Sequence, residues 1–379
     1  MPAQAFARII YSLVGITLLA AADLFANGAS ARDFEIRYHE RFEPIHKSTE
    51  QISFVAYGRQ FDLQLESNNG IFNVPSPERR RHTTALYRGR LETEANSWVR
   101  LSESNGRISG AIWDGDELWL IDSQDRLADY LLNADPATGN GNVIFRLSEV
   151  SGSLGDLVGD VVVNAGTDGI DTEPEVALAT FGPQPGRVLD IGIVATSDFG
   201  DRHGANADQI LLEMFNVVEG IFITQVGVQL RAVDIAVLDT TPTDLQENDP
   251  QTLLENFSAY KVRTPDLYPL GLAHLFVGRD LDDLDPPIRT VGMANLSVLC
   301  DGRFGVGITQ ATHATILDAL IAAHEIGHNF GAPHDAEEGS VCAAETTNFI
   351  MAPQISGSTR FSQCSIETMQ TEILSAGCM

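Results

Sequence analysis

Apolar residues in the first 150 positions recur in short runs with a period of two, the pattern of half-buried β-strands. The alternation is clearest at Phe61, Leu63 and Leu65, and Asn-Gly and Asp-Gly pairs separate some of the runs. The runs cover residues 52–57, 60–65, 86–91, 98–103, 107–113 and 117–122. This pattern predicts an antiparallel, β-rich domain over residues 32–150.

A different pattern begins at Arg187, after residues 151–186, which are rich in Gly, Asp, Pro and Thr and so have the composition of a linker. Expected strands cover 188–196, 226–238, 272–278 and 304–309, and expected helices cover 206–224, 250–262 and 315–330. Alternating strands and helices predict a mostly parallel sheet with helices on its faces. We therefore expect an α/β domain over residues 187–379.

Composition limits the possible partners more than it limits the fold. The 379 residues are 44% hydrophobic, which is enough for a full core and excludes disorder throughout. The formal net charge is −28, and Lys47 and Lys261 are the only lysines. Nucleic acid and anionic membrane surfaces are therefore not expected as partners.

The first 31 residues have the pattern of a secretory signal peptide. Arg8 precedes an apolar run over 9–22, and Ala29-Ser30-Ala31 is a small-x-small cleavage pattern. That run is too short to span a bilayer and no later run is long enough, so we expect a secreted protein without a membrane anchor. Four cysteines in an exported chain fit two disulfides, for which the sequence alone permits three pairings.

The candidate chemistry lies in residues 324–335, which read HEIGHNFGAPHD. His324 and His328 are four residues apart, so on a helix both imidazoles face one point and can bind one metal ion. A catalytic zinc ion needs three protein ligands and one open position. Gly331 allows the chain to leave the helix and turn, which returns His334 towards the metal as the third ligand.

Glu325 follows the first ligand and lies close to the open position. There a carboxylate can take a proton from water and return it to a leaving amine, so we predict that Glu325 is the general base and not a ligand. Met351 follows in the sequence FIMAP.

Together, HEIGHNFGAPH and the methionine in FIMAP resemble the metzincin zinc proteases, which carry a turn methionine beneath the metal. RTVGMA, the segment CDG that follows it and the closing segment FSQCS are similar to the adamalysin (reprolysin) branch. The resemblance covers about residues 187–379, and FDLQL with LSESNGRISG resembles the propeptide of that branch more diffusely. It implies a metzincin catalytic domain with one antiparallel edge strand over the cleft.

The same resemblance implies several details of the site. It pairs Cys300 with Cys378 and Cys342 with Cys364, and it makes Met351 a packing floor under the histidines. It also raises calcium as a second ion, with Asp190 as the one matched ligand. The edge strand that binds an extended substrate would be Gly305, Val306, Gly307, Ile308 and Thr309.

This chain departs from the family pattern in the residue that could keep the uncleaved precursor inactive. Many relatives block the metal with a propeptide cysteine, but here the first cysteine is Cys300. The segment Trp113-Asp114-Gly115-Asp116 offers a carboxylate as a substitute, and the competing interpretation is an ordinary hairpin turn at Asp114-Gly115. Maturation cleavage is expected within 151–186, near Arg187.

These observations predict a secreted zinc endopeptidase made as a zymogen, with protein or peptide substrates and a monomeric state. Two alternatives stay open. The first is a catalytically silent metal-binding module that acts by binding proteins, although a closed structural site has no need of a base such as Glu325. The second is a zinc amidase that acts on wall peptides.

Overall fold

Nine strands of the N-terminal region form one antiparallel sheet in the computed structural model, which describes residues 34–72, 84–132, 141–152, 157–162, 186–282, 289–311, 314–354 and 358–379. Their order is β2 (Glu40–Phe42), β10 (Asn142–Arg146), β9 (Leu118–Ser123), β8 (Arg107–Trp113), β7 (Trp98–Ser104), β6 (Ala85–Leu91), β5 (Arg59–Ser67), β4 (Gln51–Ala56) and β3 (His46–Lys47). The Asn105-Gly106 pair joins β7 to β8 with both residues at positive φ, 52° and 79°. The antiparallel β-rich region predicted from the sequence is confirmed.

A second, mixed sheet of six strands supports the α/β region. Its order is β12 (Leu157–Val162), β16 (Arg289–Asn295), β17 (Val306–Gln310), β15 (Leu272–Val277), β13 (Arg187–Ala195) and β14 (Val228–Val237). The strands β17, β15, β13 and β14 run parallel to one another, and β16 is antiparallel to β17. The strand β12 pairs with the outer edge of β16 and runs parallel to it.

The position predicted for the substrate edge strand is wrong. Residues Gly305, Val306, Gly307, Ile308 and Thr309 fall almost entirely in β17, which has a neighbour on each side. The antiparallel strand is instead β16, and its outer edge is paired with β12. The chain passes from β15 to β16 and returns to fill the space between them with β17, an order that periodicity along the sequence does not reveal.

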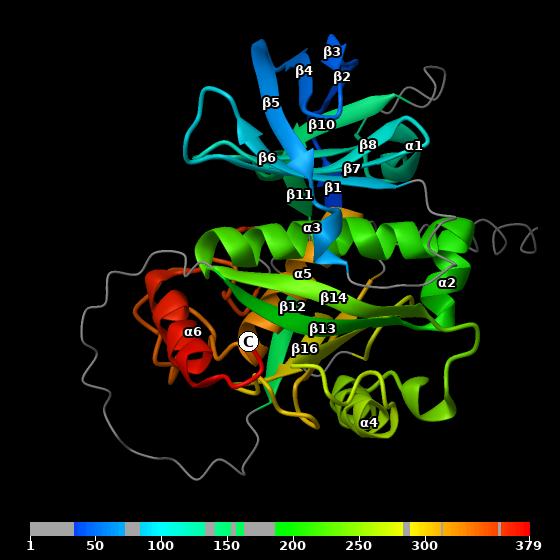
Figure 1. Cartoon of the computed structure of the whole chain (residues 1–379), viewed down its shortest axis with the longest axis vertical. Helices are drawn as coiled ribbons and strands as arrows, with labels where there is room; N and C mark the ends of the chain where they lie inside the picture. Colours follow the sequence, from blue (N-terminus) through cyan, green and yellow to red (C-terminus); the bar gives the residue numbers. More distant parts are fainter. Residues whose placement is uncertain are drawn as a thin grey trace, which may run out of the picture. The chain divides into compact units, whose positions relative to one another are not determined.

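Helices cover both faces of this sheet, as Figure 1 shows. Successive side chains of β13 point to opposite faces of the sheet. Leu189, Ile191 and Ile193 therefore belong to one apolar cluster and Val194 to another. The first cluster packs against α3 (Ala207–Gln225) and α5 (Thr315–Asn329), and the second against α4 (Pro250–Arg263). The remaining α-helices are α1 (Gln124–Leu127), α2 (Ser197–His203) and α6 (Gln363–Ser375).

Part of the segment predicted as a linker belongs to the sheets. Residues Val150–Gly152 form β11, which pairs with β1 (Phe34–Ile36), and residues 157–162 form β12. Residues 163–185, most of the segment in which the maturation cleavage is expected, lie outside the described residues, as do residues 1–33 with the expected signal peptide.

Several polar pairs join α3 to the N-terminal β-rich region, and we call three of them the α3 pairs. They are Asn68 with Asn216 at 2.8 Å, Arg100 with Glu219 at 3.0 Å and Arg126 with Glu213 at 2.7 Å. Arg100 and Glu219 are almost fully buried, with side chains 4% and 0% exposed. A charge so deeply buried needs its partner, so this pair fixes how α3 and β7 are aligned.

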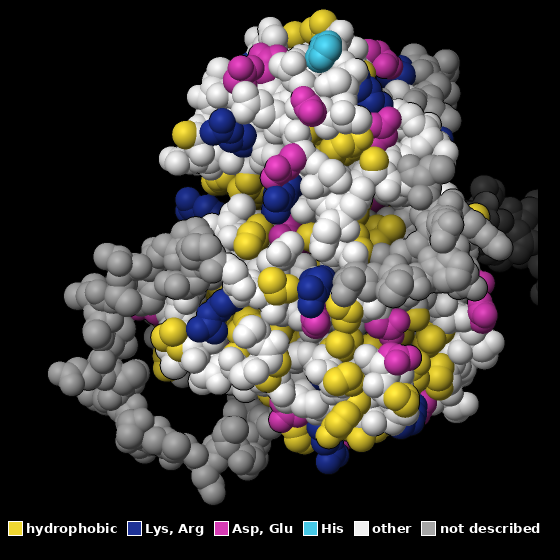
Figure 2. Space-filling view, in the orientation of Figure 1, with side chains coloured by type: hydrophobic (Ala, Val, Ile, Leu, Met, Phe, Trp, Pro, Cys, Tyr) yellow, Lys and Arg dark blue, Asp and Glu magenta, His cyan; other side chains and the backbone are white. Residues whose placement is uncertain are grey.

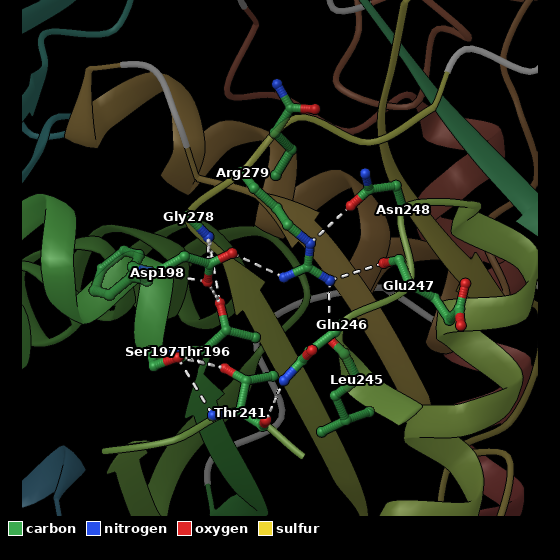
Figure 3. A network of polar contacts seen from close by, with 12 residues as sticks. Thr196, Ser197, Asp198, Thr241, Leu245, Gln246, Glu247, Asn248, Gly278 and Arg279 are labelled. Carbon is green, nitrogen blue, oxygen red and sulfur yellow. Dashed lines mark hydrogen bonds and ion pairs between the residues drawn. The ribbon is translucent and has the colours of Figure 1, made fainter. Parts of the chain in front are cut away.

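A polar network closes the ends of β13 and β15 (Figure 3). The guanidinium of Arg279 donates to Asp198 at 2.9 Å and to the carbonyl oxygens of Leu245 and Glu247 at 2.8 Å and 2.7 Å. Burial alone raises the pKa of Asp198, but the hydrogen bonds from Thr196 and Arg279 outweigh it and hold the pKa below its usual value. The network therefore anchors the loop after β14 to two strand ends.

No helix among the described residues combines the length and the apolar character needed to cross a bilayer. On the described part of the face drawn in Figure 2, basic side chains are scattered among acidic and uncharged ones and form no continuous basic patch.

Candidate metal centre

The helix α5 carries two of the three candidate ligands on a fully buried face. His324 and His328 are both 0% exposed. The helix ends at Asn329, and Gly331, two residues later, has a φ of +94° that residues other than glycine rarely adopt. The following bend returns His334, which is 4% exposed, to the same point.

The three imidazoles converge through their Nε2 atoms. The Nε2 atom of His328 lies 3.0 Å from that of His324 and 3.2 Å from that of His334. Nitrogen ligands about 2.0–2.1 Å from a tetrahedral zinc ion lie about 3.3 Å apart, close to these separations. These three residues are the one group among the described residues whose side chains are arranged to hold a metal ion.

The opposite ring nitrogens explain why the Nε2 atoms are available. The Nδ1 atom of His324 lies 2.6 Å from the carbonyl oxygen of Ile350, and that of His328 lies 2.8 Å from the carbonyl oxygen of Ala332. A carbonyl oxygen only accepts, so both Nδ1 atoms carry the proton and both Nε2 atoms present a lone pair. The close Nε2 contacts are therefore not hydrogen bonds but the arrangement of a ligand set.

Burial keeps the rings of His324 and His328 neutral. Burial and then the neighbouring His334 lower the pKa of His324 to about 3. Burial and then His324 and His334 hold the pKa of His328 well below its usual value. Neutral imidazole is the form that binds zinc, so the donor set fits that metal at neutral pH.

Glu325 lies on α5 directly after the first ligand and is 0% exposed. Its carboxylate faces Gly292 of β16, where a Cβ atom would stand 2.3 Å from Oε1. Glycine at this position of the strand therefore leaves the room that the carboxylate occupies.

Met351 lies beneath the histidine face of α5 and is 0% exposed. A Cβ atom at Gly327 would stand 2.6 Å from its sulfur, so the turn and the helix are in direct contact. The main chain of the turn also supports the site, because Asp335 donates its N–H to the carbonyl oxygen of Met351 at 2.8 Å.

The structure contains the two disulfides that the resemblance implies. Cys300 is bonded to Cys378, and Cys342 is bonded to Cys364. The first joins the turn before β17 to the end of the chain, and the second joins the loop after His334 to α6.

Asp114, one of the two acidic residues of the segment considered for latency, and Asp190 are both hydrogen-bonded to other side chains. Asp114 accepts hydrogen bonds from Arg59 at 2.8 Å and Trp119 at 2.7 Å, and it caps the hairpin turn that Gly115 and Asp116 complete. Asp190, the candidate calcium ligand, makes a two-bond ion pair with Arg231 at 2.6 Å and 2.9 Å.

Three supporting residues were not predicted from the sequence. Asn329 donates to the carbonyl oxygens of Asn295 and Val306, both at 2.9 Å, and so ties the end of α5 to β16 and β17. Asp335 accepts a hydrogen bond from Ser362 at 2.7 Å, and Glu337 lies 2.9 Å from Nδ1 of His334. Asn329 and Asp335 directly follow the predicted ligands His328 and His334. This adjacency is the only feature of the sequence that could have identified them as supporting residues.

Two histidines on one helix, a third from the following bend, an adjoining glutamate and a methionine floor define a metalloprotease-type centre. Residues 186–362 match the reprolysin-type family model described as metallo-peptidase family M12, and this match supports a metalloprotease of the reprolysin type in that region.

Proposed function

We propose that the protein is a secreted zinc endopeptidase of the adamalysin type, made as a zymogen. The observation that carries the proposal is the convergence of the Nε2 atoms of His324, His328 and His334, with the buried Glu325 directly after the first of them. The match of residues 186–362 to the metallo-peptidase family M12 model supports the peptidase chemistry.

A bound zinc ion would polarise the scissile carbonyl and lower the pKa of a water molecule. His324, His328 and His334 would hold the ion, and their Nδ1 partners keep the rings in the required tautomer. Glu325 would accept a proton from the attacking water and deliver it to the amine of the departing peptide.

The pairing of β12 with β16 supports latency without a cysteine. An extended substrate binds a protease of this architecture by adding a strand to the free edge of the antiparallel strand. In this chain, β12 pairs along that edge from Leu157 opposite Arg289 to Val162 opposite Asn295, and it also contacts α5. While β12 stays in place, a substrate has no backbone groups of β16 to pair with.

Export is supported by the two disulfides, which persist in oxidising compartments. The signal peptide over residues 1–31 is part of the proposal, and N-terminal sequencing of the exported protein tests it.

A peptide-library digest with the full chain, before and after limited proteolysis within 163–185, tests the activity. We expect cleavage of many peptides only after proteolysis, and none by Glu325→Ala or in the presence of a chelator. No cleavage by the processed chain would favour a silent metal-binding module. Cleavage restricted to wall peptides would favour the amidase.

A second experiment tests the role of β12. Alternate N–H groups of a strand point towards its neighbour, so the double variant Asp160→Pro with Val161→Pro removes at least one bond to β16. Without proteolysis, this variant should cleave peptides that the uncleaved parent chain leaves intact.

The matched control also introduces two prolines before the catalytic region, but outside β12. It is Glu173→Pro with Glu175→Pro, on either side of Pro174. This control should stay as inactive as the uncleaved parent chain. A variant at Asp160 and Val161 that folds and is equally inactive would rule out latency through β12.

A further inference from the structure

We propose that Gln225, the last residue of α3, is a positioning residue for the metal centre. It touches none of the three histidines, and it acts through two short segments of main chain. The inference rests on the proposed zinc site but not on the proposed protease activity.

The first link is a clamp on the segment that precedes α6. The side-chain amide of Gln225 donates to the carbonyl oxygen of Thr359 at 2.6 Å and accepts from the N–H of Phe361 at 2.9 Å. One amide therefore holds the residues on both sides of Arg360, which fixes the direction of the Arg360 carbonyl group.

The second link joins this segment to the methionine turn. The N–H of Ile350 donates to the carbonyl oxygen of Arg360 at 2.8 Å. The carbonyl oxygen of Ile350 in turn accepts from Nδ1 of His324 at 2.6 Å. The chain of contacts thus runs from Gln225 through Arg360 and Ile350 to a metal ligand.

Aromatic packing holds the end of α3, where Gln225 lies, in place. Phe222 lies one turn before Gln225 on α3, and its ring centroid is 5.4 Å from that of Phe361 and 4.9 Å from that of Phe330. Phe330 directly follows the last residue of α5. The end of α3 is therefore packed against the clamped segment and against the end of α5.

The physical consequence concerns the orientation of one imidazole. The partner of the outer ring nitrogen fixes the tautomer and the direction of a metal-binding histidine, and its loss costs about 10–100-fold in metal affinity. Gln225 lies beyond that partner, so its loss should cost less, about three- to tenfold. No residue of the HEIGHNFGAPHD motif would be altered.

The test compares Gln225→Met with Gln370→Met in the full chain. Gln370 is a matched control, because its amide donates to the carbonyl oxygen of Val226 at 2.9 Å and so binds at the same end of α3, but not to the clamped segment 359–361. Zinc retention is measured against a chelator of known affinity, and the absorption spectrum of the cobalt-substituted chain reports ligand geometry.

We expect Gln225→Met to release zinc at a three- to tenfold lower chelator concentration and to change the cobalt spectrum, while Gln370→Met matches the parent. Equal retention and equal spectra in the two folded variants would overturn the inference. If Gln225→Met does not fold, Gln225→Asn, one methylene shorter, takes its place. A parent chain that binds zinc but cleaves no peptide would overturn the proposed function and leave this inference standing.

Discussion

The helices α3 and α5 pack against each other and both bury polar side chains, but they use them in different ways. On α3, Glu213, Asn216 and Glu219 are 4%, 1% and 0% exposed, and each is paired with a side chain of the N-terminal β-rich region. On α5, His324 and His328 are paired through Nδ1 only.

This difference separates structural polar groups from a candidate site. A buried polar group that finds its partner within the protein aligns two elements of the fold. The α3 pairs are of this kind. The histidines of α5 keep one lone pair each directed at a common point, and that arrangement is useful only when a cation is bound.

The largest expected effect comes from breaking the buried ion pair between Arg100 and Glu219 of α3. Arg100→Met leaves the Glu219 carboxylate buried without its cation, so we expect a loss of about 3–5 kcal/mol in the free energy of unfolding. Urea unfolding measures it. The double variant with Glu219→Leu removes both charges and should recover most of the loss; a double variant as unstable as Arg100→Met would show that the pair is not the cause.

The next largest effect is expected from the loss of a candidate metal ligand on α5. His328→Phe removes a ligand, so we expect zinc affinity to fall by at least the hundredfold that an outer partner can cost, about 2.7 kcal/mol. The metal-free chain should lose only about 1 kcal/mol, because only the Ala332 carbonyl loses its donor. Titration calorimetry and urea unfolding of the metal-free chain measure the two quantities. Unchanged zinc binding would contradict the assignment of His328.

A buried histidine outside the cluster isolates the effect of burial. His274 is 0% exposed, and burial lowers its pKa to about 3. The unfolded chain, with a pKa near 6.5, then binds more protons between pH 6.5 and pH 3, so this group makes stability fall as the pH falls through that window. His274→Gln should reduce the slope by about 1.4 kcal/mol per pH unit. Urea midpoints at pH 6.5 and pH 5 measure the slope, with the exposed His46→Gln as the control.

The smallest effect concerns the support of the bend that carries His334. Ser362 caps α6 by accepting from the N–H of Ser365 at 3.0 Å, and it donates to Asp335 at 2.7 Å. Ser362→Ala should cost about 1 kcal/mol of stability. Thermal unfolding measures it, and Ser375→Ala at the other end of the helix is the control. Equal midpoints in the two variants would mean that the cap contributes little.

Local features of the sequence predicted the centre well. The spacing of His324 and His328, the helix that carries them and the turn at Gly331 depend on neighbouring residues, so the motif contains the information. The antiparallel alternation around Phe61 and the Asn105-Gly106 turn are local in the same sense.

Features that join distant residues were not predictable in this way. After β16 the chain returns to form β17 between β16 and β15, and this return decides which strands are the neighbours of β16. The strand β12 lies in a segment with the composition of a linker. The partners of α3 and the clamp of Gln225 on Thr359 lie more than 80 positions away in the sequence, beyond the reach of any periodicity.

The two disulfides are nested, since Cys342 and Cys364 both lie between Cys300 and Cys378. All three candidate metal ligands and the turn methionine therefore belong to one covalent ring. A single nick anywhere between residues 301 and 377 leaves the fragments attached to each other, so they would separate on a gel only after reduction.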